Sequence, residues 1–438
     1  MANPIPNLFR VPELKEKILF TLMVLLIYRT GAHITAPGVD VGALREQFGQ
    51  LQGTLFGVYD MFVGGALSRA TVLSLGIMPY ISASIMFQLL AAVFPTIEKL
   101  QKDEEGRKKL TQWTRYATVG LALVQAWGYA VFLQNPSFGA VQNPGFLFLA
   151  STALVLTAGA IFVMWLGEQI TERGIGNGAS LLIFFSIIEG FPGAIARTLE
   201  ALTTGVISIV QLVLLVAVMI AVVAGVVAMT MAARKIPVQI PRKVMGRGRI
   251  REGQKSFIPL RINSAGVMPI IFAQSLIIVP GTIAQFSNVR AFQGLADALQ
   301  PGSWWYYGSY SLLILFFTYF YTAIIFNPVD LAENLKKQGG FVPGVKPGAR
   351  TAEYIDYVLS RVTLPGAIYL ALIALLPFLL FDFFGIGELF FFGGTSLLIV
   401  VGVALDTVQQ MQQHLLLRHY EGFMKQGRVR YRGRQRYM

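Results

Sequence analysis

The side chains that could support catalysis or metal binding are few and far apart in this chain. It contains no cysteine, which excludes disulfides, haem thioethers and thiolate metal sites, and its three histidines are His33, His414 and His419. No G-x-x-x-x-G-K-[S/T] motif occurs, and no carboxylate, histidine or cysteine cluster suits acid–base or nucleophilic work. The sequence therefore predicts a protein that is not an enzyme, holds no cofactor or metal, and takes any driving energy from a partner.

The composition indicates a membrane protein. Of the 438 residues, 54% are hydrophobic and only 13% are charged, and the mean hydropathy is +0.59. Ten apolar windows recur, most of them near the roughly 20 residues that cross a bilayer. Because backbone groups in lipid must be paired within the segment, we expect ten helices and an all-α fold. The windows are 18–36, 75–94, 116–133, 147–166, 179–191, 206–231, 265–284, 306–326, 364–381 and 394–412.

Two internal repeats indicate a duplication. Residues 76–83 match 266–273, and residues 178–183 match 394–399. The first pair carries Pro79 and Pro269, which we expect to break two long apolar helices near the working site. We predict two pseudo-symmetric five-helix halves forming an inverted repeat. The halves cover 1–192 and 193–412, and a basic cytoplasmic tail covers 413–438.

The distribution of lysine and arginine predicts the orientation. With both termini on one side, 31 of the 36 basic residues fall on that side, which the positive-inside rule assigns to the cytoplasm. Two cytoplasmic loops, 232–263 and 327–361, hold more charge than orientation requires and resemble docking surfaces. Contact with anionic lipid explains their charge about as well, and binding to ribosomal RNA is a third reading.

Charged residues are rare within the predicted spans. Arg29, Glu189, Asp382 and Asp406 lie toward span ends, where snorkelling or capping accounts for them. A secondary transporter for a small solute also uses repeats and broken helices, but it needs titratable groups near the midplane. Their scarcity disfavours that class.

Isoleucines recur on the segments that the repeats mark. Ile81 and Ile85 share one helical face, as do Ile183 and Ile187. Their counterparts in the repeats are Ile271 and Ile399. If a pseudo-two-fold axis relates the halves, these side chains converge and form an apolar constriction that opposes ion flow by dewetting. Ordinary helix packing is the alternative reading.

The glycine-interrupted segment 53–69 precedes the second window on the outer side. It is too polar and too broken to span a bilayer. It could fold back into the mouth of a pore as a re-entrant segment, or it could form an amphipathic hairpin on the outer surface.

Four motifs closely resemble those of the SecY family, the pore subunits of bacterial protein translocons. They are LGIMPYISASI at 75–85, GIGNG at 174–178, FGGTSLLIVV at 392–401 and LRHYE at 417–421. The resemblance covers essentially the whole chain. It implies a clamshell hinged between the fifth and sixth helices that opens sideways between the second and seventh. Unfolded secretory chains would pass through it, and apolar segments would leave laterally into lipid.

The resemblance also implies roles for individual residues. The pore ring would consist of Ile81, Ile85, Ile183, Ile187, Ile271 and Ile399. The plug that seals the closed channel would be the segment 55–67, with Phe56, Tyr59, Met61, Phe62, Gly64, Gly65 and Leu67. The lateral gate would include Pro79, Ser82, Gln88, Pro269 and Gln274. The motor SecA or the ribosome would dock on Arg242, Lys243, Arg247, Arg249, Lys346 and Arg350.

Partners and location follow from the same resemblance. It implies small SecE- and SecG-like membrane subunits, the SecA ATPase, the ribosome, secretory preproteins and nascent membrane proteins, in a bacterial inner (plasma) membrane with cytoplasmic termini. One departure is that the family's Pro-Gly-Ile-Arg-Pro-Gly motif reads PGVKPG at 343–348, and Lys346 lacks arginine's planar fork of donors. An insertase or scaffold without a transverse pore is the remaining rival; it explains the basic loops but not the paired isoleucines.

Overall fold

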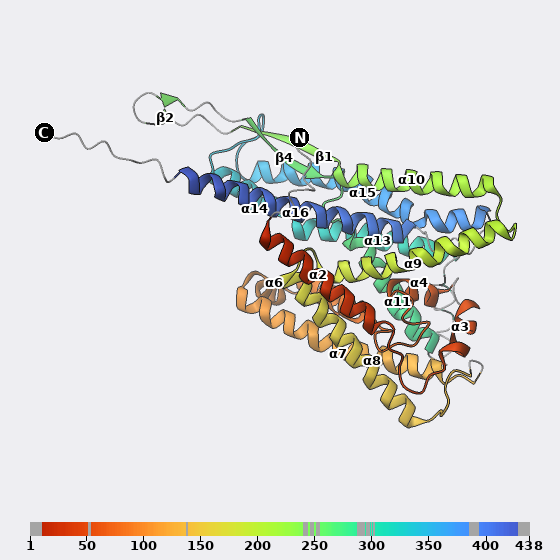
Figure 1. The fold of residues 1–438 in the computed structure, drawn as a ribbon. Coiled ribbons are helices and arrows are strands. Elements are labelled where there is room, and N and C mark those ends of the chain that lie inside the picture. Colours follow the sequence, from red (N-terminus) through yellow and green to blue (C-terminus); the bar gives the residue numbers. More distant parts are fainter. Residues whose placement is uncertain are drawn as a thin grey trace.

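The computed structural model of the chain describes residues 11–50, 54–136, 139–239, 244–245, 249–250, 255–286, 294, 298, 300, 303–384 and 394–427. Helices dominate (Figure 1). The first half contains α2 (Pro12–Gly31), α3 (Val41–Gln50), α4 (Leu55–Phe62), α5 (Met78–Val93), α6 (Pro95–Lys102), α7 (Glu104–Leu133), α8 (Phe146–Arg173) and α9 (Gly178–Thr203). The second contains α10 (Ile209–Met231), β1 (Ala233–Gln239), β2 (Val244–Met245), β3 (Arg249–Ile250), β4 (Lys255–Arg261), α11 (Met268–Phe286), α13 (Trp304–Ile325), α14 (Pro328–Lys337), α15 (Ala349–Phe384) and α16 (Gly394–Gly427).

A helix lies over each of the ten predicted windows. Among the described residues, six helices are long and apolar enough to cross a membrane, or seven if α5 and α6, bent by 111°, form one span. The chain is therefore a multi-span membrane protein. The count of ten spans stays a prediction, because helices such as α2 do not pass this test of length and apolarity.

The two repeat prolines begin helices. Pro79 lies in the first turn of α5, and Pro269 is the second residue of α11. In a first turn the missing N–H of proline costs no helical hydrogen bond, and its fixed φ suits the helix. The prediction that these prolines break their helices was therefore wrong. A break does occur after α5, where Phe94 is extended before Pro95.

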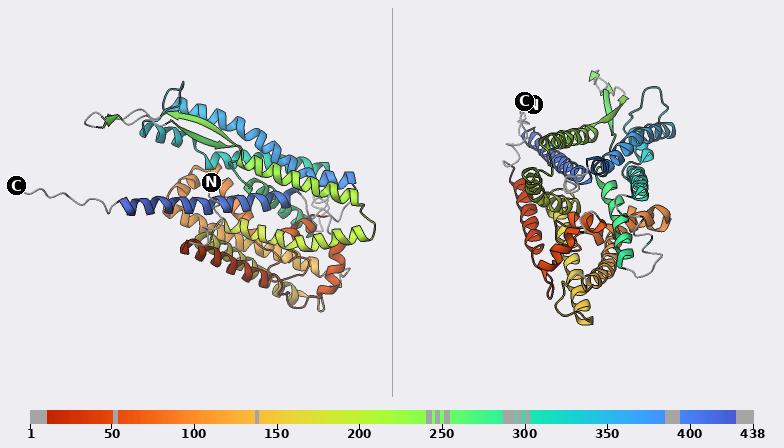
Figure 2. Two further views of the ribbon diagram at one scale, coloured as in Figure 1. Left: turned by 45° about the horizontal axis from the view of Figure 1, so that its top comes forward. Right: turned by 90° about the vertical axis from the view of Figure 1, so that its right-hand side faces the viewer.

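The helices form two groups around a shared core. Figures 1 and 2 place α2, α7 and α8 on one side and α10, α13 and α15 on the other, with α9 and α11 between them. Buried side chains from both groups belong to one apolar cluster, which also includes α4 and the start of α16. The centre of the molecule is thus where the repeat-marked segments meet.

The two basic loops fold together. β1 and β4 form an antiparallel ribbon from Ala233 opposite Arg261 to Gln239 opposite Lys255, and Gln239 also pairs with Phe341 of the second loop. A small second core joins both loops, with Ile236, Val238, Leu260, Val342, Ile355 and Leu359. The all-α prediction missed this ribbon, which lies at the same end of the molecule as the C-terminal end of α16 (Figure 1).

Candidate functional site

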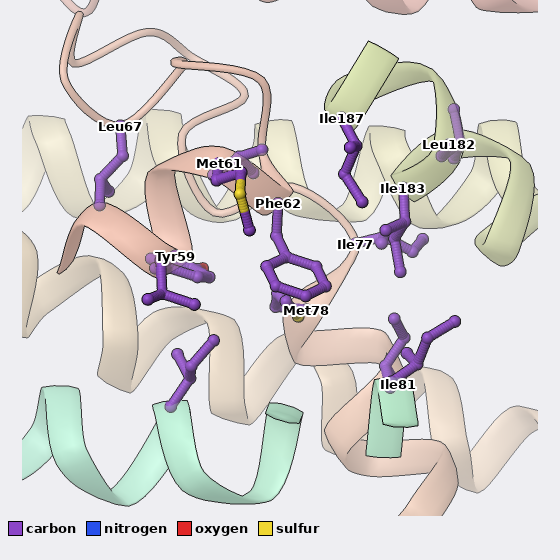
Figure 3. Packing of buried hydrophobic residues seen from close by; sticks show 14 of the residues in the cluster. Tyr59, Met61, Phe62, Leu67, Ile77, Met78, Ile81, Leu182, Ile183 and Ile187 are labelled. Carbon is purple, nitrogen blue, oxygen red and sulfur yellow. The ribbon is translucent and has the colours of Figure 1, made fainter. Parts of the chain in front are cut away.

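The predicted plug segment folds into the core. The Thr54 side chain accepts a hydrogen bond from Phe56 N at 3.3 Å and so caps α4, whose eight residues are mostly apolar. Helix α4 packs against α9 and α11, and Figure 3 shows Met61 and Phe62 beside Ile183 and Ile187 of α9. The alternative of a hairpin on the outer surface is inconsistent with this burial. The buried side chains are Leu55, Phe56, Val58, Tyr59, Met61, Phe62, Val63, Ala66 and Leu67.

Directional bonds fix this segment to its surroundings. The Tyr59 hydroxyl donates to the Leu75 carbonyl at 2.9 Å, and the Tyr129 hydroxyl of α7 donates to the Leu67 carbonyl at 2.6 Å. The Ser396 hydroxyl at the start of α16 donates to Met61 Sδ at 3.1 Å. The segment is therefore bonded to its own return loop, to α7 and to α16.

The connection to α5 passes close to the end of α4. Gly76 has φ +53°, and a Cβ on it would lie 2.2 Å from Val63 Cγ1. Only glycine combines this backbone conformation with so close an approach. The first glycine of the GIMPYISA repeat thus allows the plug segment and α5 to pack together.

All six predicted ring isoleucines are buried in one cluster. None is more than 4% exposed, and they come from α5, α9, α11 and α16. Ile81, Ile183 and Ile271 line a cavity of about 270 Å³. The structure brings these residues together, and the closed ring around a pore axis stays a prediction.

The lining of this cavity becomes polar away from the isoleucines. Arg115 of α7 donates from Nε and Nη2 to the two carboxylate oxygens of Glu168 of α8, both at 2.9 Å. A neighbouring cavity of about 390 Å³ shares Asn177 and Ser180 with it and extends to Asp406. Both cavities therefore have charged and polar residues as well as apolar residues in their lining.

A direct polar contact joins the two predicted gate helices. Helix α5 packs against α11, and the hydroxyl oxygens of Ser82 and Ser275 lie 2.7 Å apart. The sequence reasoning named Ser82 and missed Ser275, although Ser275 follows Ile271 by four residues and so shares its helical face. Of the other predicted gate residues, Gln274 is buried, and Gln88 donates to Ser84 on its own helix.

Two arginines and a glutamate form a cluster that the sequence reasoning also missed. Glu189 lies midway along α9 and forms ion pairs with Arg29 of α2 and with Arg69, which follows the plug segment. Arg29 lies in the last turn of α2, as the reading of snorkelling or capping expects, but the ion pairs with Glu189 were not predicted.

The predicted docking residues are only partly described. Lys346 and Arg350 are exposed, and Val345 beside Lys346 packs on the second core. Only the backbone of Arg249, in β3, is described, and Arg242, Lys243 and Arg247 lie outside the described residues, as does the tail beyond Gly427. Within the described residues no group of three or more His, Cys, Asp or Glu could hold a metal ion.

Comparison with known proteins identifies the family. A sequence model of the SecY family matches residues 71–408, which span the two predicted gate helices and all six predicted ring isoleucines. The chain belongs to the SecY family. This is a family of translocase subunits and not of enzymes.

Relatives of the SecY family match the chain along its length. The protein translocase subunit SecY of Aquifex aeolicus is 44% identical over 431 residues, covering 97% of this chain and 100% of the relative. Two solved structures share the fold at 18% identity, each covering 94% of this chain and 97% of theirs. One concerns the plug domain of the SecY protein, which stabilises the closed channel and maintains a membrane seal (TM-score 0.65), and the other is Sec61 in a canine ribosome–channel complex (TM-score 0.60).

Proposed function

We propose that this chain is the central channel subunit of a bacterial Sec translocase, which passes unfolded secretory proteins across the plasma membrane. The observation that supports this most is that the plug segment and the isoleucines of four helices are buried in one apolar cluster, in which α4 packs against α9 and α11. Burial of the plug segment in this cluster is what a channel that is closed at rest would need. The channel reading therefore explains why an apolar, glycine-interrupted segment lies inside the molecule.

The six isoleucines are the proposed pore ring. Branched hydrocarbon side chains offer no hydrogen bonds to water or ions, so a narrow ring of them stays dry when empty. They also have no directional bonds to break when a polypeptide pushes them apart. The ring therefore limits ion flow around a chain in transit.

The boundary between α5 and α11 is the proposed lateral gate. One hydroxyl pair, Ser82 with Ser275, is a modest polar link between these helices. A signal sequence that binds between the helices better than they bind each other shifts the gate toward the open state. Apolar segments of nascent membrane proteins then leave through the gap into lipid.

The two cytoplasmic loops are the proposed docking surface for SecA or the ribosome. The shared second core presents Lys346 and Arg350 beside the β1–β4 ribbon. SecA hydrolysis of ATP or ribosomal synthesis supplies the driving energy, and SecE- and SecG-like subunits complete the complex. Ten spans in two inverted halves, with both termini in the cytoplasm, complete this proposal.

A single cysteine at Ile271 tests the channel, and the cysteine-free chain needs no other change. Vesicles containing the Ile271→Cys variant and its small partner subunits receive a cysteine-bearing secretory chain, stalled during SecA-driven translocation. We expect a disulfide that depends on substrate and ATP. Leu312→Cys, on an α13 side chain that is 66% exposed, is the matched control and should not react. Equal reaction at both sites, or none at Ile271 despite verified stalling, would contradict the channel.

A further inference from the structure

A partly buried charged cluster lies where the plug segment ends. Glu189 of α9 forms ion pairs with Arg29 of α2 and with Nη2 of Arg69, the latter at 3.2 Å. The side chains of Arg29, Arg69 and Glu189 are 34%, 18% and 12% exposed. The Glu189 carboxylate thus connects α9 both to α2 and to the loop that follows the plug segment.

Arg69 carries this connection into the plug itself. Its Nε donates to the Gly65 carbonyl at 2.8 Å, and its Nη2 donates to the Gly64 carbonyl at 2.9 Å as well as to Glu189. These two carbonyls belong to the turn that ends α4. Arg69 therefore bonds that turn to α9 through Glu189, and the turn cannot move outward without breaking at least one of these bonds.

The turn approaches Glu189 closely, in a backbone conformation that favours glycine. Gly64 has φ +68°, and a Cβ on it would lie 3.1 Å from Glu189 Oε2 and 3.3 Å from the Ser186 backbone. Ser186 in turn bonds the Tyr28 hydroxyl of α2 at 2.9 Å. The plug's terminal turn is thus seated against the surface where α2 meets α9.

The other polar groups around Arg69 support its orientation. Arg69 Nη1 donates to His33 Nε2 at 3.0 Å, so His33 carries its proton on Nδ1, which donates to the Arg29 carbonyl at 2.9 Å. Asp60 of α4 accepts from the Ser68 amide at 2.9 Å, which fixes the loop just before Arg69. The guanidinium therefore has partners in several directions, and its position is set by all of them.

We propose that Glu189 is a latch that holds the plug segment closed by binding Arg69, and that opening the channel breaks this bond while the Arg29–Glu189 pair persists. The proposal rests on the plug function proposed above. Because Arg29 remains beside Glu189 when Arg69 leaves, the carboxylate is never buried without a partner, which keeps the open state accessible. Glu189 thus has a charged partner both in the closed state, with Arg29 and Arg69, and in the open state, with Arg29 alone. The bond to Arg69 can therefore break and form again, which a purely apolar contact would not provide for.

The test uses the full chain with its small partner subunits in vesicles. Two quantities are measured: resting ion leak, and crosslinking between Met61→Cys and Ser396→Cys, whose native side chains touch. Glu189→Gln keeps the shape and removes the charge, and Glu200→Gln, an exposed glutamate on the same helix, is the matched control. We expect Glu189→Gln to raise the leak and to lower the crosslinking rate by about tenfold, the scale of one lost charge-assisted bond, and Glu200→Gln to change neither.

A double variant distinguishes the latch from a general loss of packing. Glu189→Gln combined with Arg69→Gln should leak clearly less than the sum of the two single variants, because both remove the Arg69–Glu189 bond. Additive effects would overturn the latch. Should Glu189→Gln fail to insert, Arg69→Lys carries the same test, since lysine cannot reach two carbonyls and Glu189 with a planar fork.

Deletion of 55–67 separates this proposal from the plug function. If the deletion raises the leak and Glu189→Gln does not, the latch is wrong and the plug stands. If the deletion leaves the leak unchanged, the plug function fails, and the latch fails with it.

Discussion

The plug segment and the isoleucine cluster are both buried and apolar, yet they are held in different ways. Tyr59, Met61 and the Leu67 carbonyl each have a directional polar partner, on the return loop, α16 and α7 respectively. The isoleucines have hydrocarbon side chains, so the hydrophobic effect and dispersion hold them in the shared core. Hydrogen bonds weaken steeply once their geometry is lost, whereas many small dispersion contacts can be exchanged one at a time. The plug segment is thus suited to two discrete positions, and the isoleucine cluster to gradual widening.

The largest expected effect comes from a charge placed on the plug segment. Phe62 is 2% exposed, and a carboxylate there would be buried without a partner, at a cost of about 3 kcal/mol or more. We expect Phe62→Asp to displace the plug and to raise resting ion leak by roughly a hundredfold, measured in planar bilayers. Phe62→Leu is the matched control. A leak no higher in the aspartate variant than in the leucine variant would contradict a seated plug.

A shortened side chain in the isoleucine cluster should raise ion leak during translocation and not at rest. Ile183→Ala removes packing worth about 2 to 5 kcal/mol, but the plug segment still blocks the resting channel. We therefore expect little change in resting leak and a clear rise when a secretory chain is stalled inside. Ile368→Ala, on a side chain that is 45% exposed, is the control. An equal rise at rest and during stalling would show that the two regions form one seal.

A smaller effect should follow from one directional bond of the plug. Tyr59→Phe removes the hydroxyl that donates to the Leu75 carbonyl at 2.9 Å, worth about 1 kcal/mol. We expect crosslinking between Met61→Cys and Ser396→Cys to slow about fivefold, while Tyr116→Phe, on an exposed ring, leaves it unchanged. An unchanged rate in Tyr59→Phe would mean that packing alone positions the segment.

The smallest expected effect concerns the gate. Ser275→Ala breaks the hydroxyl pair with Ser82, a neutral hydrogen bond worth about 1 kcal/mol or less. We expect export of preproteins with weakened signal sequences to rise about two- to fivefold, while export with strong signals stays the same. Ser309→Ala on α13 serves as the control, since Ser309 bonds only within its own helix among the described contacts. A uniform change for all signals would argue against a role at the gate.

Sequence reasoning succeeded where a local pattern decides the structure. Apolar windows gave the positions of ten helices, and the repeats pointed to isoleucines that the fold gathers into one cluster. Most side chains of 55–67 are buried, as a short helix with mostly apolar side chains requires, and the re-entrant plug stays a prediction.

It failed where the decisive contact joins distant segments. Arg69 and Glu189 are 120 residues apart in sequence, and Ser82 and Ser275 are 193 apart, so no helical or strand period relates them. The ribbon β1–β4 likewise depends on pairing across a long loop and on Phe341. The prolines misled for a local reason: proline disrupts a helix only beyond its first turn.

The β1–β4 ribbon also links the second core to the bases of two helices. Its seven paired residues span ~24 Å at the usual rise per residue, and the ladder continues to the bond from the Ile262 amide to the Ala232 carbonyl at 3.0 Å, directly after α10. From Ile262, five residues (263–267) lead into α11. A force applied at the outer end of the ribbon therefore has two routes. One leads through its base to the end of α10 and the start of the helix that carries Ser275 and Ile271, and the other leads through Phe341 to the second loop.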